Sequence, residues 1–271
     1  MNTTLTRPDA VLHYELRGSG PLVVLTAAPM GADSFHPLAE LLAPEFTVLT
    51  SDPRGIGRSP LTAADATSTP ELRAADVAAL IEHVDAGPAV VLGSSGGAVH
   101  ALALAQARPD LVRRVVAHEP PLIELLPDRA EQHARAAEVR AVFASGDRVR
   151  GWRMWLDDAG LVLPDEVFDQ FFGREPTARE AADEHFAQQV MEGPTTEFRP
   201  DLAALRAVDV VVGIGEESAG QVCDRTSRAL AAALGTEPVL FPGDHTGFAE
   251  VPEAFAAVLR PLLEVPRTAA G

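Results

Sequence analysis

Residues 89–107 read AVVLGSSGGAVHALALAQA, and this stretch decides the class of fold. Its first four residues form the uninterrupted apolar run that is typical of a strand buried in a parallel sheet. A turn of glycine and serine follows at residues 93–97, and the pattern then becomes helical without a break. The stretch therefore predicts a buried strand that turns sharply into a helix.

The turn has the pattern G-x-S-x-G centred on Ser95. A serine on such a sharp turn has a strained backbone, and the residues two before and two after it must be small so that strand and helix can pass closely. Gly93 and Gly97 meet this requirement, whereas Ser94 would need a glycine where the chain has Leu92. A dinucleotide-binding turn would instead need G-x-G-x-x-G, which is absent here. We therefore predict that Ser95 is a nucleophile.

Apolar runs and helical patterns alternate over most of the chain, as in a mostly parallel sheet with helices on both faces. The pattern predicts an α/β protein. We expect strands at residues 11–16, 22–25, 46–50, 89–92, 112–118, 210–214 and 238–241, and helices at 34–42, 70–84, 96–107, 225–234 and 252–263.

The alternation of strand and helix patterns stops between residues 120 and 206. No strand is indicated there, and charged helical segments carry most of the large aromatic side chains. We interpret residues 120–206 as a helical cap inserted into a core formed by residues 1–119 and 207–271. Trp155 and Phe172 either line a substrate pocket or form the small core of the cap itself, and the sequence leaves both readings open.

His245 is the candidate base. It lies in the loop PGDHTGF at residues 242–248, directly after the last expected strand, and it follows Ser95 in chain order. Most of the other histidines fall on expected helices or in the inserted segment. A histidine in a loop at the end of a strand is well placed to activate a serine.

Taken together, three motifs resemble those of the α/β-hydrolase superfamily. They are GSSGG at residues 93–97, PGDHTGF at residues 242–248, and SDPRGIGRS at residues 51–59, which is similar to the D-x-R-G-x-G-x-S loop after the family's fourth strand. The resemblance covers nearly the whole chain. It implies that Ser95 attacks an acyl group to form an acyl-enzyme, with His245 as general base.

The resemblance also implies an oxyanion hole formed by two backbone N–H groups. One is the N–H of Gly96, the residue after the nucleophile, and the other by position is that of Ala28. In the family a His-Gly pair ends the third strand, and here Thr26 and Ala27 replace it.

The acid that orients His245 has several candidates. The family usually places it in a G-x-x-D run after the strand that follows the cap, but residues 215–218 read Gly-Glu-Glu-Ser. Some members place it one strand earlier, where this chain has Glu119 at the end of an expected strand. We favour Glu119, with Glu217 or Glu216 as alternatives, and a Ser–His dyad or Asp244 as a further possibility.

The function that these residues indicate is a serine hydrolase that cleaves a carboxylic ester or related acyl bond of a small molecule. The resemblance equally allows a carbon–carbon bond hydrolase, a cofactor-free haloperoxidase or perhydrolase, or a tailoring enzyme of secondary metabolism. From a different class, a catalytically silent member would only bind a small molecule. Turnover of a short chromogenic ester distinguishes the two classes.

The composition restricts the partners and cofactors that the protein can use. The formal net charge of −17 disfavours nucleic acid and anionic membranes as partners, and no apolar run approaches the length of a membrane span. All 22 basic residues are Arg, which excludes lysine-dependent cofactor chemistry. The one cysteine, Cys223, has no metal-site spacing and is interpreted as a core residue. We expect a cytoplasmic enzyme that needs neither metal nor organic cofactor, and the sequence does not indicate its oligomeric state.

Overall fold

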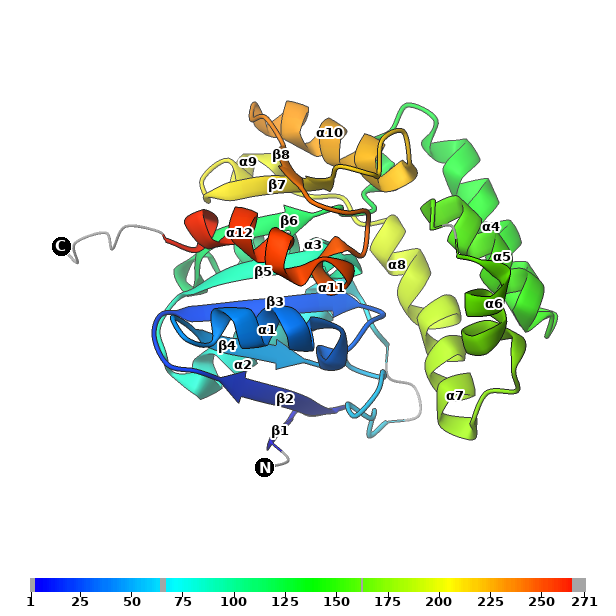
Figure 1. Cartoon of the computed structure of the whole chain (residues 1–271), viewed down its shortest axis with the longest axis horizontal. Helices are drawn as coiled ribbons and strands as arrows, with labels where there is room; N and C mark the ends of the chain where they lie inside the picture. The colour runs from blue at the N-terminus through cyan, green and yellow to red at the C-terminus, as the bar shows by residue number, and fades with distance from the viewer. Residues whose placement is uncertain (1–2, 64–66, 162, 265–271) are drawn as a thin grey trace.

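A computed structural model describes residues 3–63, 67–161 and 163–264 of the chain. The tail at residues 267–271, which the sequence predicts to be frayed, lies outside the described residues. Eight strands form one sheet in the order β1-β2-β4-β3-β5-β6-β7-β8, in which β1 and β2 run antiparallel to their neighbours and the others are parallel (Figure 1). The strands are β1 Thr3–Thr6, β2 Val11–Arg17, β3 Leu22–Ala28, β4 Thr47–Ser51, β5 Ala89–Ser95, β6 Val112–His118, β7 Val210–Gly215 and β8 Val239–Phe241.

Helices cover both faces of this sheet, which confirms the predicted α/β class of fold (Figure 1). Successive side chains of a strand point to opposite faces. Leu22 and Val24 of β3 accordingly belong to one core cluster, whereas Val23 and Leu25 belong to the other. The longer helices and α11 that supply side chains to the two clusters are α1 His36–Leu42, α2 Pro70–Val84, α3 Gly96–Ala107, α10 Val222–Leu234, α11 Gly247–Glu250 and α12 Pro252–Leu263, and the short elements that contain Phe35 and Leu205 add one side chain each.

The chain between β6 and β7 is helical and lies to one side of the sheet, next to the ends of the parallel strands (Figure 1). It has its own apolar cluster around Trp152, Leu156 and Phe168. No helix among the described residues is long and apolar enough to cross a bilayer. The helical elements of this part and the short ones elsewhere are α4 Arg129–Ala144, α5 Arg148–Ala159, α6 Asp165–Phe168, η4 Asp169–Gly173, α7 Ala178–Phe186, η5 Ala187–Met191, α8 Glu192–Thr196, α9 Leu202–Leu205, η1 Ala32–Phe35, η2 Pro109–Leu111 and η3 Ile123–Leu125.

Glycines at the turn from β5 to α3 allow the helix to pass close to the sheet. A Cβ on Gly97 would lie 2.2 Å from the carbonyl oxygen of Thr26 on β3, and one on Gly93 would lie 2.4 Å from the carbonyl oxygen of Gly97. Both contacts are with backbone, which cannot move aside without shifting a strand or a helix. The small residues required on either side of Ser95 are therefore explained by close packing.

Replacing Gly97 by alanine should destabilise the fold by ~1–3 kcal/mol because the new methyl group overlaps β3. Urea unfolding measures this change. Gly193→Ala is the matched control, since a Cβ at Gly193 in α8 has no heavy atom within 4 Å. If both variants unfold at the same urea concentration as the parent protein, the proposed close contact at Gly97 is wrong.

Candidate active site

Ser95 lies where β5 ends and α3 begins, with φ 55° and ψ −127°. For a residue with a side chain this positive φ is strained, and strain of this kind gathers at functional sites. The turn holds the half-buried serine at the wall of a pocket that His245 also lines. The structure thus brings together two residues that are 150 positions apart in the sequence.

Ala28 and Gly96 are next to this serine. Ala28 is the last residue of β3 and the register partner of Ser95 on β5, and a Cβ on Gly96 would lie 2.9 Å from the Ala28 carbonyl oxygen. Both residues line the same pocket as Ser95.

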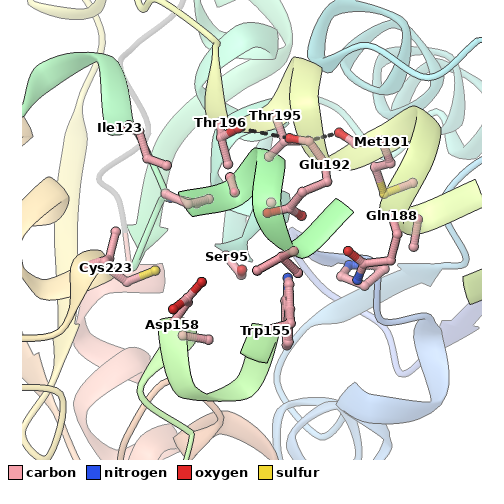
Figure 2. A pocket seen from close by; sticks show the side chains of 18 of the residues that line it. Ser95, Ile123, Trp155, Asp158, Gln188, Met191, Glu192, Thr195, Thr196 and Cys223 are labelled. Carbon is pink, nitrogen blue, oxygen red and sulfur yellow. Dashed lines mark hydrogen bonds between the residues drawn. The ribbon is translucent and has the colours of Figure 1, made fainter. Parts of the chain in front are cut away.

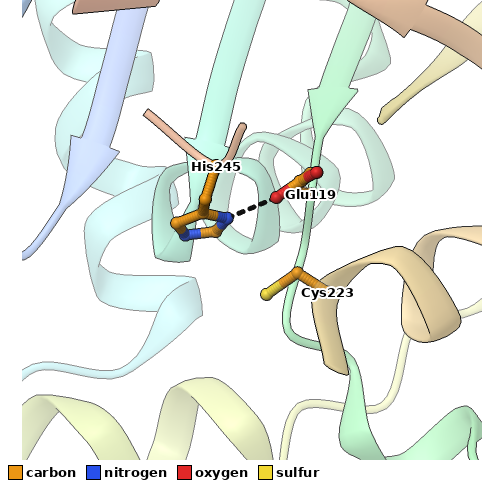
Figure 3. Close-up of side chains that lie close together, drawn as sticks. All are labelled: Glu119, Cys223 and His245. Atoms are coloured by element: carbon orange, nitrogen blue, oxygen red, sulfur yellow. Dashed lines mark hydrogen bonds and ion pairs between the residues drawn. The ribbon is translucent and has the colours of Figure 1, made fainter. Parts of the chain in front are cut away.

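His245 is hydrogen-bonded to Glu119 in the protein interior (Figure 3). The distance between His245 Nδ1 and Glu119 Oε2 is 2.5 Å, and the two residues are 3% and 0% exposed. The second carboxylate oxygen, Oε1, accepts a hydrogen bond of 2.8 Å from the backbone N–H of Gly215 on β7. Glu119 directly follows β6, so two adjacent strand ends hold the carboxylate in place.

The pKa values of this pair reflect mutual stabilisation. Burial raises the pKa of a carboxyl group, but the hydrogen bond and the positive charge of His245 outweigh burial and lower the pKa of Glu119 to about 2. Burial likewise disfavours the imidazolium, yet Cys223 and Glu119 raise the pKa of His245 well above its usual value of 6.5. By linkage, the stability that Glu119 supplies is present above pH ~4.5 and is lost as the pH falls toward 2.

The other acid candidates are not bonded to His245. Glu216 and Glu217 are exposed on the loop after β7. Asp244 accepts hydrogen bonds from the backbone N–H and the hydroxyl of Thr246. Among the described residues, Glu119 is therefore the one acid candidate that is hydrogen-bonded to His245.

The pocket that contains Ser95 and His245 has a volume of about 140 Å³. Figure 2 shows Ser95 with Trp155, Glu192, Gln188 and Cys223 arranged around it. Trp155 comes from α5, and further lining residues come from α4, η5 and α8, so the helical segment between β6 and β7 forms much of the wall.

The two aromatic residues predicted for the pocket lie in different surroundings. Trp155 lines the pocket, which is one of the two alternatives that the sequence leaves open. Phe172 is not among the lining residues and packs against Trp152, with ring centroids 4.7 Å apart, inside the apolar cluster of the helical segment.

Cys223 is one of the pocket residues that the sequence does not indicate. It is the second residue of α10, is 7% exposed and lines the pocket beside Ser95 and His245. A single cysteine in a helical pattern looks like a core residue, and nothing in the adjacent sequence indicates which side chains it meets. Only the packing of α10 against the end of β7 places it here.

The donor atoms of Glu119, Cys223 and His245 all lie within 4.8 Å of one another (Figure 3). Thiolate, imidazole and carboxylate are ligands that Zn²⁺ accepts. In this arrangement, however, His245 Nδ1 and Glu119 already share a hydrogen bond, so that nitrogen has no free lone pair for a metal ion. The geometry fits an oriented histidine better than a metal centre.

Comparison with known proteins agrees with the fold. A family model described as "alpha/beta hydrolase fold" matches residues 20–143. The uncharacterized hydrolase YraK of Bacillus subtilis is 30% identical over 279 residues, which cover 97% of this chain and 96% of YraK. A putative non-heme bromoperoxidase of Mycobacterium tuberculosis, BpoC, is 39% identical over 108 residues, or 39% of this chain and 40% of BpoC.

Solved structures extend the likeness to nearly the whole chain. An alpha/beta hydrolase from Sphaerobacter thermophilus has a TM-score of 0.68 and 26% identity, covering 97% of this chain and 100% of that one. A thermophilic esterase from Thermogutta terrifontis has a TM-score of 0.66 and 23% identity, covering 97% and 96%. The chain therefore belongs to the α/β-hydrolase family, and it is a hydrolase of that fold.

Modification of Cys223 should block the pocket. Because the chain has one cysteine, methyl methanethiosulfonate can add its methylthio group only there. We expect hydrolysis of 4-nitrophenyl acetate to fall at least ~10-fold after modification, since the added group occupies space beside Ser95. Initial rates measure the hydrolysis, and intact mass measures the extent of modification.

The matched control is Cys223→Ala, which should keep its activity in the presence of the reagent. Full modification of the parent protein without loss of activity would show that the thiol does not face the space that substrate occupies.

Proposed function

We propose that this protein is a serine hydrolase that cleaves a carboxylic ester or a related acyl bond of a small molecule through an acyl-enzyme intermediate. The observation that carries the proposal is the bond of 2.5 Å from His245 Nδ1 to Glu119. It keeps the proton of neutral His245 on Nδ1 and leaves Nε2 with a lone pair. Ser95 shares the pocket with this imidazole.

In the proposed first step, Ser95 Oγ attacks the acyl carbon and His245 Nε2 takes the hydroxyl proton. The acyl oxygen gains negative charge, which the N–H groups of Gly96 and Ala28 stabilise. The tetrahedral intermediate collapses, the bond to the alcohol breaks, and the imidazolium returns its proton to the leaving alkoxide. The acyl group then remains on Ser95.

In the second step, water attacks the acyl-enzyme and His245 takes one of its protons. Collapse of the second intermediate breaks the bond to Ser95 Oγ, which recovers a proton from His245, and the acid leaves. Glu119 stabilises the imidazolium in both steps because its carboxylate stays bonded to Nδ1.

We further propose that residues 120–206 act as a lid on a core of residues 1–119 and 207–271. The side chains that this segment contributes to the pocket support the proposal. Trp155 would then limit the size of the group bound next to Ser95.

A fluorophosphonate probe should label Ser95, and Ser95→Ala should abolish labelling and turnover without unfolding the protein. Intact mass and peptide mapping identify the labelled residue, and thermal unfolding checks the fold. Labelling that persists in Ser95→Ala would assign the nucleophile to another residue.

Glu119→Gln should lower kcat by ~10²–10⁴, because an amide cannot stabilise the imidazolium that forms on His245. Glu217→Gln is the matched control and should change kcat less than about tenfold, since Glu217 is exposed. Steady-state kinetics on 4-nitrophenyl acetate measure both. The reverse order of the two effects would move the acid to the loop after β7.

The pH profile of kcat/KM gives an independent check on the same pair. The base acts when His245 is neutral, so activity rises as the pH passes the raised pKa of His245, above 6.5. Glu119→Gln removes a negative charge that favours the imidazolium, so the rise should move to lower pH. A profile whose rise keeps the same midpoint in Glu119→Gln contradicts this account.

A further inference from the structure

Two polar groups on the helical wall of the pocket have no part in the proposed chemistry. Arg140 comes from α4 and Glu192 from α8, and both line the pocket with Ser95. In Figure 2 the carboxylate of Glu192 points into the pocket. Charged groups facing an otherwise mostly apolar cavity usually determine which ligand it accepts.

Arg140 has no ion pair within 4.0 Å to any residue that the structure describes. Arg135, five residues earlier on the same helix, also lines the pocket, but its charge is matched by Asp158 at 2.8 Å. Because a guanidinium in a partly buried site gains from a carboxylate partner, Arg140 has unused capacity to bind an anion.

A second unmatched guanidinium lies behind the same wall. Arg73 is 1% exposed, and its hydrogen bonds go to neutral groups, namely His100 at 3.2 Å, Ser68 at 2.9 Å and the pocket residue Thr195 at 2.6 Å. Within the described chain no carboxylate lies within 4.0 Å of it. Glu192, Glu71 and Asp76 act on this charge only from beyond ion-pair distance, so an excess of positive potential remains behind the pocket wall.

Glu192 does not cancel this excess. Burial raises the pKa of Glu192, and the charges of Arg140 and Arg73 only partly oppose that effect. An ionised Glu192 is shared between Arg140 and Arg73, and Glu71 and Asp76 also act on Arg73. Asp158, the other acid that lines the pocket, is already matched by Arg135.

Gln188 adds a further polar group to this wall. It is 2% exposed, and its side-chain Oε1 has no hydrogen-bond partner among the described residues. A rotation of the amide by half a turn exchanges oxygen for N–H, which would then donate to an anion in the pocket.

We propose that the pocket is built for a substrate that carries a carboxylate group in addition to the acyl bond that is cleaved, and that Arg140 binds this carboxylate. This inference rests on the proposed function and names its substrate class.

The test compares two nearly isosteric substrates, monomethyl glutarate and methyl 4-carbamoylbutanoate, in which a neutral carboxamide replaces the carboxylate. We expect kcat/KM, measured by titration of released acid, to be ~10-fold to 100-fold higher for the carboxylate because its hydrogen bonds are charge-assisted. Arg140→Gln should bring the ratio of the two kcat/KM values close to one. Arg129→Gln, an exposed arginine of the same helix, should leave the ratio unchanged.

A ratio of one or below in the parent protein, or a ratio that Arg140→Gln does not lower, overturns the carboxylate proposal. Calorimetry measures binding of the two esters to Ser95→Ala. Because binding needs no turnover, this measurement tests the carboxylate site even if the proposed hydrolysis of esters is wrong. If neither ester is hydrolysed, tighter binding of monomethyl glutarate than of the carboxamide, lost in Arg140→Gln, supports the carboxylate site. Equal binding, tighter binding of the carboxamide, or no binding of either compound refutes it.

Discussion

The hydrogen bond between Glu119 and His245 is the interaction on which the rest of the site depends. It joins the end of β6 to the loop after β8, and the N–H of Gly215 on β7 fixes the carboxylate between them. Parallel strands that end at one edge of a sheet make this meeting possible. A buried carboxylate without His245 would be strongly disfavoured, so the pair positions the imidazole and stabilises the fold together.

Most of the fold could be predicted from the sequence, because buried strands and covering helices have distinct periods. Each predicted strand and helix is present among the described residues, with shifts of a few positions such as α10, which begins at Val222 instead of residue 225. The strand β1 was not predicted, since Thr3–Thr6 is a short edge strand of partly buried and exposed residues with no apolar run. Such a strand forms because β2 offers it a partner.

The residues of the candidate site that could be predicted are those that a local sequence pattern marks. Ser95 stands in a turn that only small neighbours allow, and His245 stands in a loop after a strand. Glu119 was favoured among several acids because it ends a strand, and the structure bonds it to the histidine. Cys223 and Arg140 carry no such signal, because tertiary packing of α10 and α4 alone brings them to the pocket.

We propose that Ser95, activated by the His245–Glu119 pair, becomes acylated during turnover. Rapid mixing with 4-nitrophenyl acetate, followed by acid quenching and peptide mass analysis, measures this step. We expect a burst of about one 4-nitrophenolate per active site and an acetyl group on the peptide that contains Ser95. Turnover without any acyl-peptide in quenched samples, or an acetyl group on a different residue, would contradict it.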